Sequence, residues 1–200
     1  MKFLPYGERS VLIELGFSAA SEIKTIRDCF PEAEVLLGLE SVVLRFPEAK
    51  DYLEHVAENF PKLSKTTAAT GEYRSIPIHY NGEDLSNIAS LLKLSTEELI
   101  EIHQQTIWQV ALIGFAPGFP YLVPATHQDL YSQIPRLDSP RTKVPANSVA
   151  LAGGMCCIYP NSSPGGWQLI GSTSVSLFDT ERENPSLLAV GDLIRFEQVQ

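Results

Sequence analysis

The sequence predicts an α+β fold in two domains, residues 1–74 and residues 75–200. Strand-like and helix-like stretches alternate in the first domain, whereas from Gly114 onward glycine and proline become dense and the strands become short. Residues 64–71 are small and polar, the composition of a linker or a long turn. Short strands punctuated by turns favour an all-β barrel or sandwich for the second domain.

The first domain reads as strand, helix, strand, strand, helix. Its elements are expected at residues 10–15, 18–30, 34–37, 41–46 and 47–60. Pro31 ends the first of the two helices. In the second helix, Tyr52, Val56 and Phe60 recur at i, i+4 and i+8, the spacing of one helical face.

The second domain opens with a strand at residues 76–80, whose Pro77 suggests a sheet edge or a strand start. A helical stretch starts near Leu85, and a further helix follows Ser95, because Ser95 and Glu98 have the spacing of a capping box. The strands expected after that helix are residues 107–113, 149–151, 158–159, 167–170, 175–177 and 193–196.

Composition and charge exclude some classes of function. Of the 200 residues, 44% are hydrophobic and 20% are charged, as in an ordinary globular protein. The formal net charge of -9 argues against nucleic-acid binding, because phosphates need cations to neutralise them. The sequence shows no signal peptide and no membrane-spanning run. Cys29, Cys156 and Cys157 read as reduced thiols, so a cytoplasmic protein without membrane contact is expected.

A loop rich in glycine, proline and aromatic residues runs from Gly114 to Leu122. Gly118 permits backbone torsions closed to other residues, and the two prolines stiffen the chain. Such a loop after a buried strand would hold Phe119 and Tyr121 at fixed positions as the wall of a site. The alternative is a structural turn that keeps Phe115 and Phe119 in the core.

A proline-stiffened basic segment, residues 135–145, contains Arg136, Arg141 and Lys143. A stiff backbone lowers the entropic cost of aiming several cations at one point, and arginine suits the recognition of carboxylate or phosphate. In so acidic a protein this segment is the best candidate for an anion-binding site. The alternative is a solvated loop in which arginine pairs with Asp138.

Glycine-rich turns form a third motif, in which Gly154, Gly165 and Gly166 would let another backbone or a ligand approach closely. Trp167, which follows directly, belongs either to the core, the commoner case, or to the wall of a pocket.

His103 is the histidine best placed for a role, because it precedes the strand that leads into the glycine-proline loop. The sequence contains no phosphate loop, dinucleotide-binding fingerprint, zinc-protease motif or nucleophile elbow. No spacing of cysteine and histidine indicates a metal site.

Taken together, these segments resemble one family. The loop at 114–122, the segment at 135–145 and the stretch at 158–167 match in order the motifs of the KipI/PxpB family. This family is also called allophanate hydrolase subunit 1 or the carboxyltransferase subunit-like family, and it supplies the B subunit of 5-oxoprolinase. The resemblance implies a small ferredoxin-like domain at residues 1–74, followed by a cyclophilin-like β-barrel domain at residues 75–200.

The resemblance also implies a non-autonomous subunit of an ATP-dependent 5-oxoprolinase, which opens 5-oxo-L-proline to L-glutamate together with two partners, a C subunit plus an A subunit. On this hypothesis Arg136, Arg141 and Lys143 hold anionic groups, and His103 and Arg141 are catalytic. The other residues expected at the site are Gly118, Phe119, Tyr121, Gly154, Gly165, Gly166 and Trp167. ATP is expected as a substrate shared with the partner subunits, and no metal or prosthetic group is expected.

Residues 155–157 depart from the family pattern in an informative way. After Gly154 the family usually has glutamine, threonine and glycine, whereas Met155, Cys156 and Cys157 follow here. A site built around the glutamine would lose a hydrogen bond. This change favours an alternative, a KipI-like inhibitor of a sensor histidine kinase. A third hypothesis is a carboxyltransferase half that acts on urea-type amides.

Overall fold

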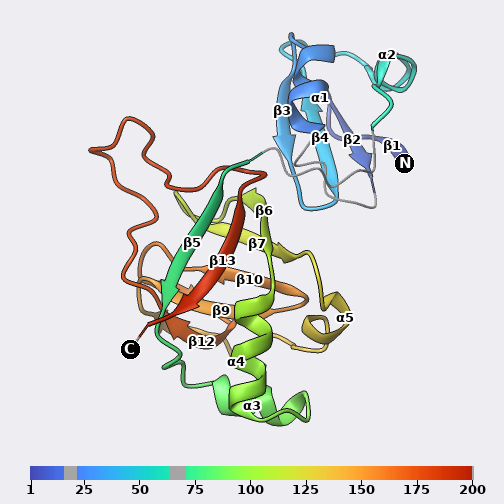
Figure 1. Cartoon of the computed structure of the whole chain (residues 1–200). Coiled ribbons are helices and arrows are strands. Elements are labelled where there is room, and N and C mark those ends of the chain that lie inside the picture. The colour runs from blue at the N-terminus through green and yellow to red at the C-terminus, as the bar shows by residue number, and fades with distance from the viewer. Residues whose placement is uncertain (16–21, 64–70, 200) are drawn as a thin grey trace. The chain divides into compact units, whose positions relative to one another are not determined.

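The computed structural model of the chain divides into two compact units, Met1–Thr70 and Gly71–Gln200 (Figure 1). The structure describes residues 1–15, 22–63 and 71–199. All but the last residue of the linker predicted at 64–71 therefore lies outside the described residues, as does the start of the first predicted helix.

The first unit is a four-stranded antiparallel sheet with two helices. Its elements are β1 (Lys2–Pro5), β2 (Ser10–Glu14), α1 (Ile23–Cys29), β3 (Glu34–Leu37), β4 (Ser41–Arg45) and α2 (Leu53–Asn59). The strand order is β1-β2-β4-β3, so β4 lies between the two strands that flank α1 in the sequence. A ferredoxin-like domain runs β-α-β-β-α-β, whereas the described elements of this unit run β-β-α-β-β-α, and the first strand, β1, forms one edge of the sheet. The ferredoxin-like assignment stays a prediction.

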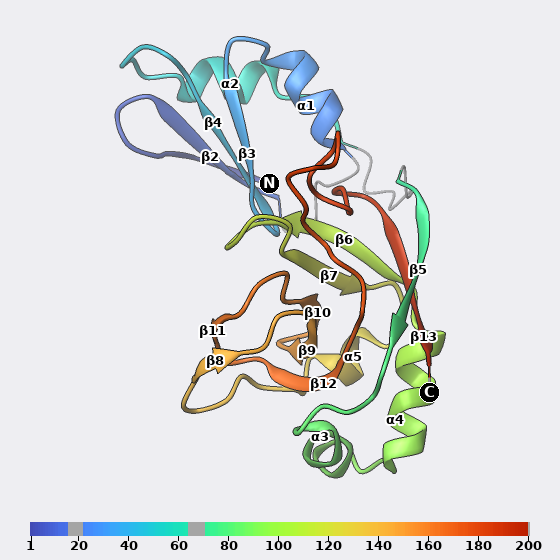
Figure 2. The same ribbon diagram turned by 90° about the vertical axis from the view of Figure 1, so that its left-hand side faces the viewer.

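The core of the first unit lies between one face of this sheet and the two helices (Figure 2). Alternate residues of β2 and β4 point to this face, as the two-residue period of a strand requires. The residues that pack there include Val11, Ile13, Ile26, Val42, Leu44 and Val56. Helix α2 is shorter than the helix predicted at 47–60, because it begins only at Leu53. Just before that start, the Asp51 side chain accepts a hydrogen bond from the Leu53 amide at 2.9 Å.

The second unit is built on a curled seven-stranded sheet (Figure 2). Its elements are β5 (Tyr73–Ile78), α3 (Leu85–Leu91), α4 (Thr96–Gln105), β6 (Trp108–Ile113), β7 (Pro120–Pro124), α5 (Gln128–Tyr131), β8 (Arg141–Val144), β9 (Ser148–Ala152), β10 (Met155–Ile158), β11 (Ser163–Gly165), β12 (Gln168–Ser172) and β13 (Leu193–Gln198). The large sheet has the order β12-β9-β10-β7-β6-β13-β5, and β8 pairs with β11 in a small separate sheet.

The two edges of the large sheet come together at one point. His79, just after β5, and Ser172, the last residue of β12, exchange backbone hydrogen bonds of 2.8 and 2.9 Å. The sheet therefore curls far enough for its edge strands to touch at one end, which agrees with the barrel-like second domain that the sequence predicts. The finer assignment, a cyclophilin-like barrel, stays a prediction.

Several local predictions are confirmed. In the capping box of α4, the Glu98 amide donates to the Ser95 hydroxyl at 3.1 Å and the Ser95 amide donates to the Glu98 carboxylate at 2.7 Å. Strand β5, which contains Pro77, lies at a sheet edge as predicted. The strand predicted at 175–177 is wrong, because that segment contains no strand. Strands β1, β7, β8 and β11 and helix α5 were not predicted.

The large sheet packs on both faces, and this division positions the site. On one face, Leu151 and Cys156 belong to the main core, which also includes residues of α3 and α4. On the other face, Ala150 and Cys157 belong to a second cluster with Phe119, which we call the outer cluster. The outer cluster also contains Val144, Ala152, Tyr159, Trp167 and Leu169.

Candidate functional site

Four aromatic side chains make a continuous row on the outer cluster, and we call it the aromatic row. Phe115 packs edge-on against Phe119 with ring centroids 5.3 Å apart. Phe119 lies 5.1 Å from Tyr121, which lies 5.9 Å from Trp167. Phe119 and Trp167 are buried, Tyr121 is half-buried, and Phe115 is exposed. The row therefore runs from the loop before β7 to the residue just before β12, and its accessible members are Phe115 and, in part, Tyr121.

Arg136 stands at the Trp167 end of the aromatic row. Its guanidinium carbon lies 5.8 Å from the centre of the Trp167 ring, within the range of a cation–π contact. The side chain is exposed, and it makes no ion pair with any residue that the structure describes. Burial raises the pKa of Tyr121, while the positive charge of Arg136 acts in the opposite direction. An available cation thus sits beside a phenol and an indole.

Two hydrogen bonds hold the basic segment against the glycine-rich turn. The Leu137 amide donates to the Gly166 carbonyl at 2.8 Å, and the Gln168 side-chain amide donates to the Pro135 carbonyl at 2.8 Å. These bonds flank Arg136 on both sides. Gly165 is required nearby, because a side chain there would collide with the Tyr159 hydroxyl group. The contact between the basic segment and the glycine-rich turn therefore has a backbone cause.

The other two predicted glycines act as turns at the rim of this region. Gly154 has a φ of +81°, and its amide donates to the Tyr131 carbonyl at 3.1 Å, which attaches the β9–β10 turn to the chain before the basic segment. Gly118 has a φ of +73°, and a side chain there would press on Phe178. Both positions need glycine for backbone reasons.

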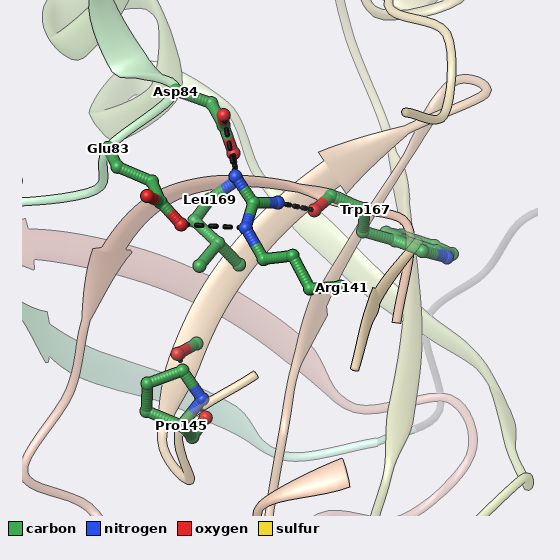
Figure 3. A network of polar contacts seen from close by, with 7 residues as sticks. Glu83, Asp84, Arg141, Pro145, Trp167 and Leu169 are labelled. Carbon is green, nitrogen blue, oxygen red and sulfur yellow. Dashed lines mark hydrogen bonds and ion pairs between the residues drawn. The ribbon is translucent and has the colours of Figure 1, made fainter. Parts of the chain in front are cut away.

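Arg141 is held by two carboxylates (Figure 3). Its Nη2 donates to both oxygens of Asp84 at 2.8 and 2.9 Å, and its Nε donates to Glu83 at 2.6 Å. Its Nη1 donates to the Trp167 carbonyl at 3.3 Å, and the Leu169 amide donates to Asp84 at 2.6 Å. The guanidinium therefore links β8 to the residues that directly precede α3 and to the residue that directly precedes β12. Its pairing partner is not Asp138, which the sequence offered as the alternative.

Lys143 lies on the same strand as Arg141, two residues further along. Because side chains alternate along a strand, it points to the side opposite Val144, which packs in the outer cluster. Lys143 is exposed. Of the three predicted cations, Arg136 is the one whose guanidinium lies over a ring of the aromatic row, whereas Arg141 contacts the row through the Trp167 carbonyl.

His103 lies on the other face of the sheet, in the main core, and is 1% exposed. Its Nδ1 is 2.8 Å from the Tyr80 hydroxyl and its Nε2 is 3.8 Å from the Cys156 sulfur. Burial lowers the pKa of this imidazole to about 3. Cys156 and Cys157 are neighbours in β10 and point to opposite faces, so β10 separates His103 from the aromatic row.

Residues 155–157, which depart from the family pattern, also lie largely inside the protein. Cys156 and Cys157 are fully buried, and burial raises the pKa of both thiols well above the usual value. Met155 is half-buried. This trio therefore fills space in the two cores, and the exposed surface around Arg136 does not depend on it.

Sequence reasoning missed three residues of this region. Phe115 was considered only as a core residue, although it is the end of the aromatic row. Asp84 and Glu83 lie 57 and 58 residues from Arg141, and no local pattern links them to it. Within the described part of the chain, no cluster of three or more histidine, cysteine, aspartate or glutamate side chains could hold a metal ion. None of the described helices is long and apolar enough to cross a membrane.

Comparison with known families and proteins gives matches over most of the chain. The model of the family described as carboxyltransferase domain, subdomain C and D, matches residues 1–188. The chain is 39% identical to the 5-oxoprolinase B subunit of Haemophilus influenzae, over 82% of this chain and 78% of that relative. It is 37% identical to the 5-oxoprolinase B subunit of Escherichia coli O157:H7, over 95% of this chain and 92% of that relative.

Solved structures give the same picture of the fold. The crystal structure of TTHA0988 is 31% identical, with a TM-score of 0.77, and the match covers 96% of this chain but 40% of that chain. The K. lactis urea amidolyase is 19% identical, with a TM-score of 0.75, over 99% of this chain and 15% of that chain. At this identity the second likeness concerns the fold alone.

Proposed function

Because the chain belongs to the carboxyltransferase subdomain C and D family, the family of the 5-oxoprolinase B subunit, we propose that it is the B subunit of an ATP-dependent 5-oxoprolinase. The complex opens 5-oxo-L-proline to L-glutamate, and this chain acts in it with two partners, a C subunit plus an A subunit. The observation that carries the proposal is the likeness to the Escherichia coli B subunit, which spans 95% of this chain and 92% of that relative.

The aromatic row and Arg136 support a role in holding the substrate. 5-Oxo-L-proline carries a carboxylate on a small, nearly flat ring. A guanidinium is suited to bind the carboxylate, and aromatic side chains are suited to cover the ring. Arg136 is exposed and lies 5.8 Å from the Trp167 ring, with Tyr121 beside that ring. We assign Arg136 to the substrate carboxylate and Tyr121 to the ring, with the buried Trp167 supporting both side chains.

Arg141 and His103 receive other roles in this proposal. The guanidinium of Arg141 already donates to Asp84, Glu83 and the Trp167 carbonyl, so it positions Trp167 and does not hold the substrate. His103 is enclosed by Tyr80, Cys156 and the aromatic side chains of the main core. It supports the fold of the sheet and has no contact with the proposed substrate. ATP, and the groups that bind it, are assigned to the assembled complex.

The sequence change at Met155 to Cys157 does not favour a regulatory protein over this enzyme role, because Cys156 and Cys157 are buried and the residues assigned to the substrate are elsewhere. The free thiols are consistent with a reducing compartment, and we propose that the complex is cytoplasmic. The KipI-like alternative would be favoured by two results together: the chain binds and inhibits a sensor histidine kinase, and the assembled complex does not open 5-oxo-L-proline.

The test uses the A, B and C subunits, purified together and assayed for ATP-dependent formation of glutamate from 5-oxo-L-proline. Arg136→Ala should lower kcat/KM by about 10- to 100-fold, because one charge-assisted contact to a carboxylate is lost. Arg136→Lys should recover part of that loss. Lys143→Ala is the matched control, since it removes a cation of the same segment that points away from the aromatic row, and it should leave the rate within about twofold. Wild-type complex without activity would refute the proposed function.

A further inference from the structure

The proposed site depends on the direction in which the Arg136 side chain points. Arginine has a long side chain with many rotamers, and an exposed one loses conformational freedom when it binds a ligand. Arg136 is exposed, and its guanidinium carbon lies 5.8 Å from the centre of the Trp167 ring. A fixed backbone beneath Arg136 therefore lowers the entropic cost of binding a substrate carboxylate at that position.

Two hydrogen bonds fix that backbone, one on each side of Arg136. The Leu137 amide donates to the Gly166 carbonyl at 2.8 Å. On the other side, the Gln168 side-chain amide donates to the Pro135 carbonyl at 2.8 Å. Residues 135–137 and 166–168 therefore lie side by side and run in opposite directions, which places Arg136 opposite Trp167.

This pattern is that of a non-hydrogen-bonded pair in an antiparallel sheet, with one difference. In a regular ladder the bonds on both sides of such a pair join backbone groups, and the two side chains between them lie close together. The bond at Leu137 is of that kind. At Pro135, the Nε2 of Gln168 takes the place that the backbone amide of Gln168 has in a regular ladder. The side chain therefore completes a frame around Arg136 and Trp167 that the backbone leaves half made.

The position of Gln168 suits it to hold this frame. Gln168 is the first residue of β12, pairs with Leu151 of β9 and is 8% exposed, and a buried side-chain amide is rarely left without a partner. Pro135 has no amide hydrogen, so its carbonyl is the backbone group that can hold it. Because Trp167 directly precedes Gln168, the ring beneath Arg136 and the donor that holds Pro135 belong to one short stretch of chain.

We propose that Gln168 is a positioning residue of the substrate site: it holds Arg136 over Trp167 in the orientation that binds the substrate carboxylate. This inference rests on the proposed function, because it takes Arg136 to contact the substrate. Gln168 itself does not touch the substrate. It acts through the carbonyl of Pro135, and its loss leaves the Leu137 amide as the one remaining hydrogen bond of the frame.

The test compares kcat and KM for 5-oxo-L-proline in the assembled complex of the A, B and C subunits. Gln168→Met removes the donor and keeps the length of the side chain. It should raise KM by about 3- to 10-fold and leave kcat within about twofold, because the carboxylate contact is loosened while the reacting groups are unchanged. Gln168→Leu, a shorter apolar replacement, should give the same result. An unchanged KM in these variants would overturn the inference.

A double-mutant cycle separates positioning from a general loss of structure. In the Arg136→Ala background, Gln168→Met should change kcat/KM by no more than about twofold, because the side chain that it positions is already absent. The same loss in both backgrounds would mean that Gln168 acts on the fold and not through Arg136, which overturns the inference.

Gln109→Met is the matched control, since it makes the same exchange at a 9% exposed glutamine on β6 of the same sheet. It should leave kcat and KM within about twofold of wild type, and a rise in KM equal to that of Gln168→Met would count against a specific role of Gln168.

The outcomes separate this inference from the function on which it rests. Wild-type complex without activity would refute the proposed function. Wild-type activity with unchanged kinetics in Arg136→Ala would remove Arg136 from the substrate, and the role of Gln168 with it. An impaired Arg136→Ala variant beside an unimpaired Gln168→Met variant would overturn this inference alone.

Discussion

At the scale of single residues, His103 shows how completely the main core excludes water. The imidazole contacts Tyr80 and Cys156 and packs beside Trp108 and Phe196, with ring centroids 5.3 and 4.7 Å away. Because burial disfavours the charged form, the pKa of His103 falls to about 3. The side chain is therefore a neutral hydrogen-bonding group at physiological pH.

This burial predicts an acid-dependent loss of stability. The folded-state pKa of about 3 lies below the ordinary value of 6.5, so below pH 6.5 the unfolded state binds a proton that the folded state does not. The free energy of unfolding should fall as pH drops from 6.5 toward 3, by up to about 1.4 kcal/mol per pH unit from this residue. Urea unfolding at pH 7, 6 and 5 would measure the slope.

The matching variant is His103→Gln, which keeps hydrogen-bonding capacity and removes the titration. It should be less stable than wild type at pH 7 and should show a shallower decline toward pH 5. Parallel slopes for wild type and His103→Gln would mean that the imidazole is not held neutral in the folded protein.

Two arginines illustrate what local sequence can and cannot predict. Arg136 and Arg141 each follow a proline in the same basic segment, and nothing in the sequence distinguishes them. Arg136 lies over the Trp167 ring. Arg141 pairs with Asp84, 57 residues earlier in the chain. A contact at such separation has no local signature, so its structural role could be found only from coordinates.

At the scale of elements, the strands and helices with a strong local signal were predictable. Strands β2 and β4 carry the two-residue alternation of a half-buried sheet, and α4 carries a capping box. Strands β8 and β11 pair with each other across an irregular register, and neither has a pattern of its own. Residues 175–177 look like a strand but belong to an irregular connection. The Leu177 carbonyl accepts a hydrogen bond from the Leu187 amide at 2.8 Å, but the pairing continues only as an isolated bridge between Phe178 and Ser186.

The Arg141 cluster should act as a clamp between elements. Arg141→Ala should lower the free energy of unfolding by about 2–3 kcal/mol, because it leaves Asp84, which is 6% exposed, without its cation. Asp84→Asn should cost a similar amount. The double variant should cost less than the sum, since both changes remove one interaction.

Urea unfolding followed by tryptophan fluorescence would measure these differences, with Lys143→Ala expected within about 0.5 kcal/mol of wild type. Additive effects of the Arg141 and Asp84 variants would show that the two side chains do not act together. An Arg141→Ala variant as stable as wild type would show that the contacts of Arg141 do not stabilise the fold.

At the scale of the whole molecule, the chain contains two units with separate cores. Both tryptophans, Trp108 and Trp167, belong to the second unit. Tryptophan fluorescence should therefore report on the second unit, whereas far-ultraviolet circular dichroism reports on both. This asymmetry provides a way to follow the units individually.

Leu44→Ala removes a fully buried side chain from the core of the first unit and should cost about 2–5 kcal/mol there. On heating, part of the circular dichroism signal should be lost at a lower temperature, while the midpoint measured by tryptophan fluorescence stays unchanged. Ile158→Ala, in the main core, should shift the fluorescence midpoint instead. A common shift of both signals in Leu44→Ala would indicate that the units unfold as one.

The position of β13 has a consequence for biosynthesis. Residues Leu193–Gln198 lie between β5 and β6, parallel to the first and antiparallel to the second. While the ribosome has not yet made this segment, β5 has no strand beside it in the large sheet, and β6 lacks its neighbour on one side. The nascent second unit therefore waits with open strand edges, which invite aggregation, until residue 198 has left the exit tunnel. The strands described in the first unit are all made by residue 45, so their sheet is free to form long before that moment.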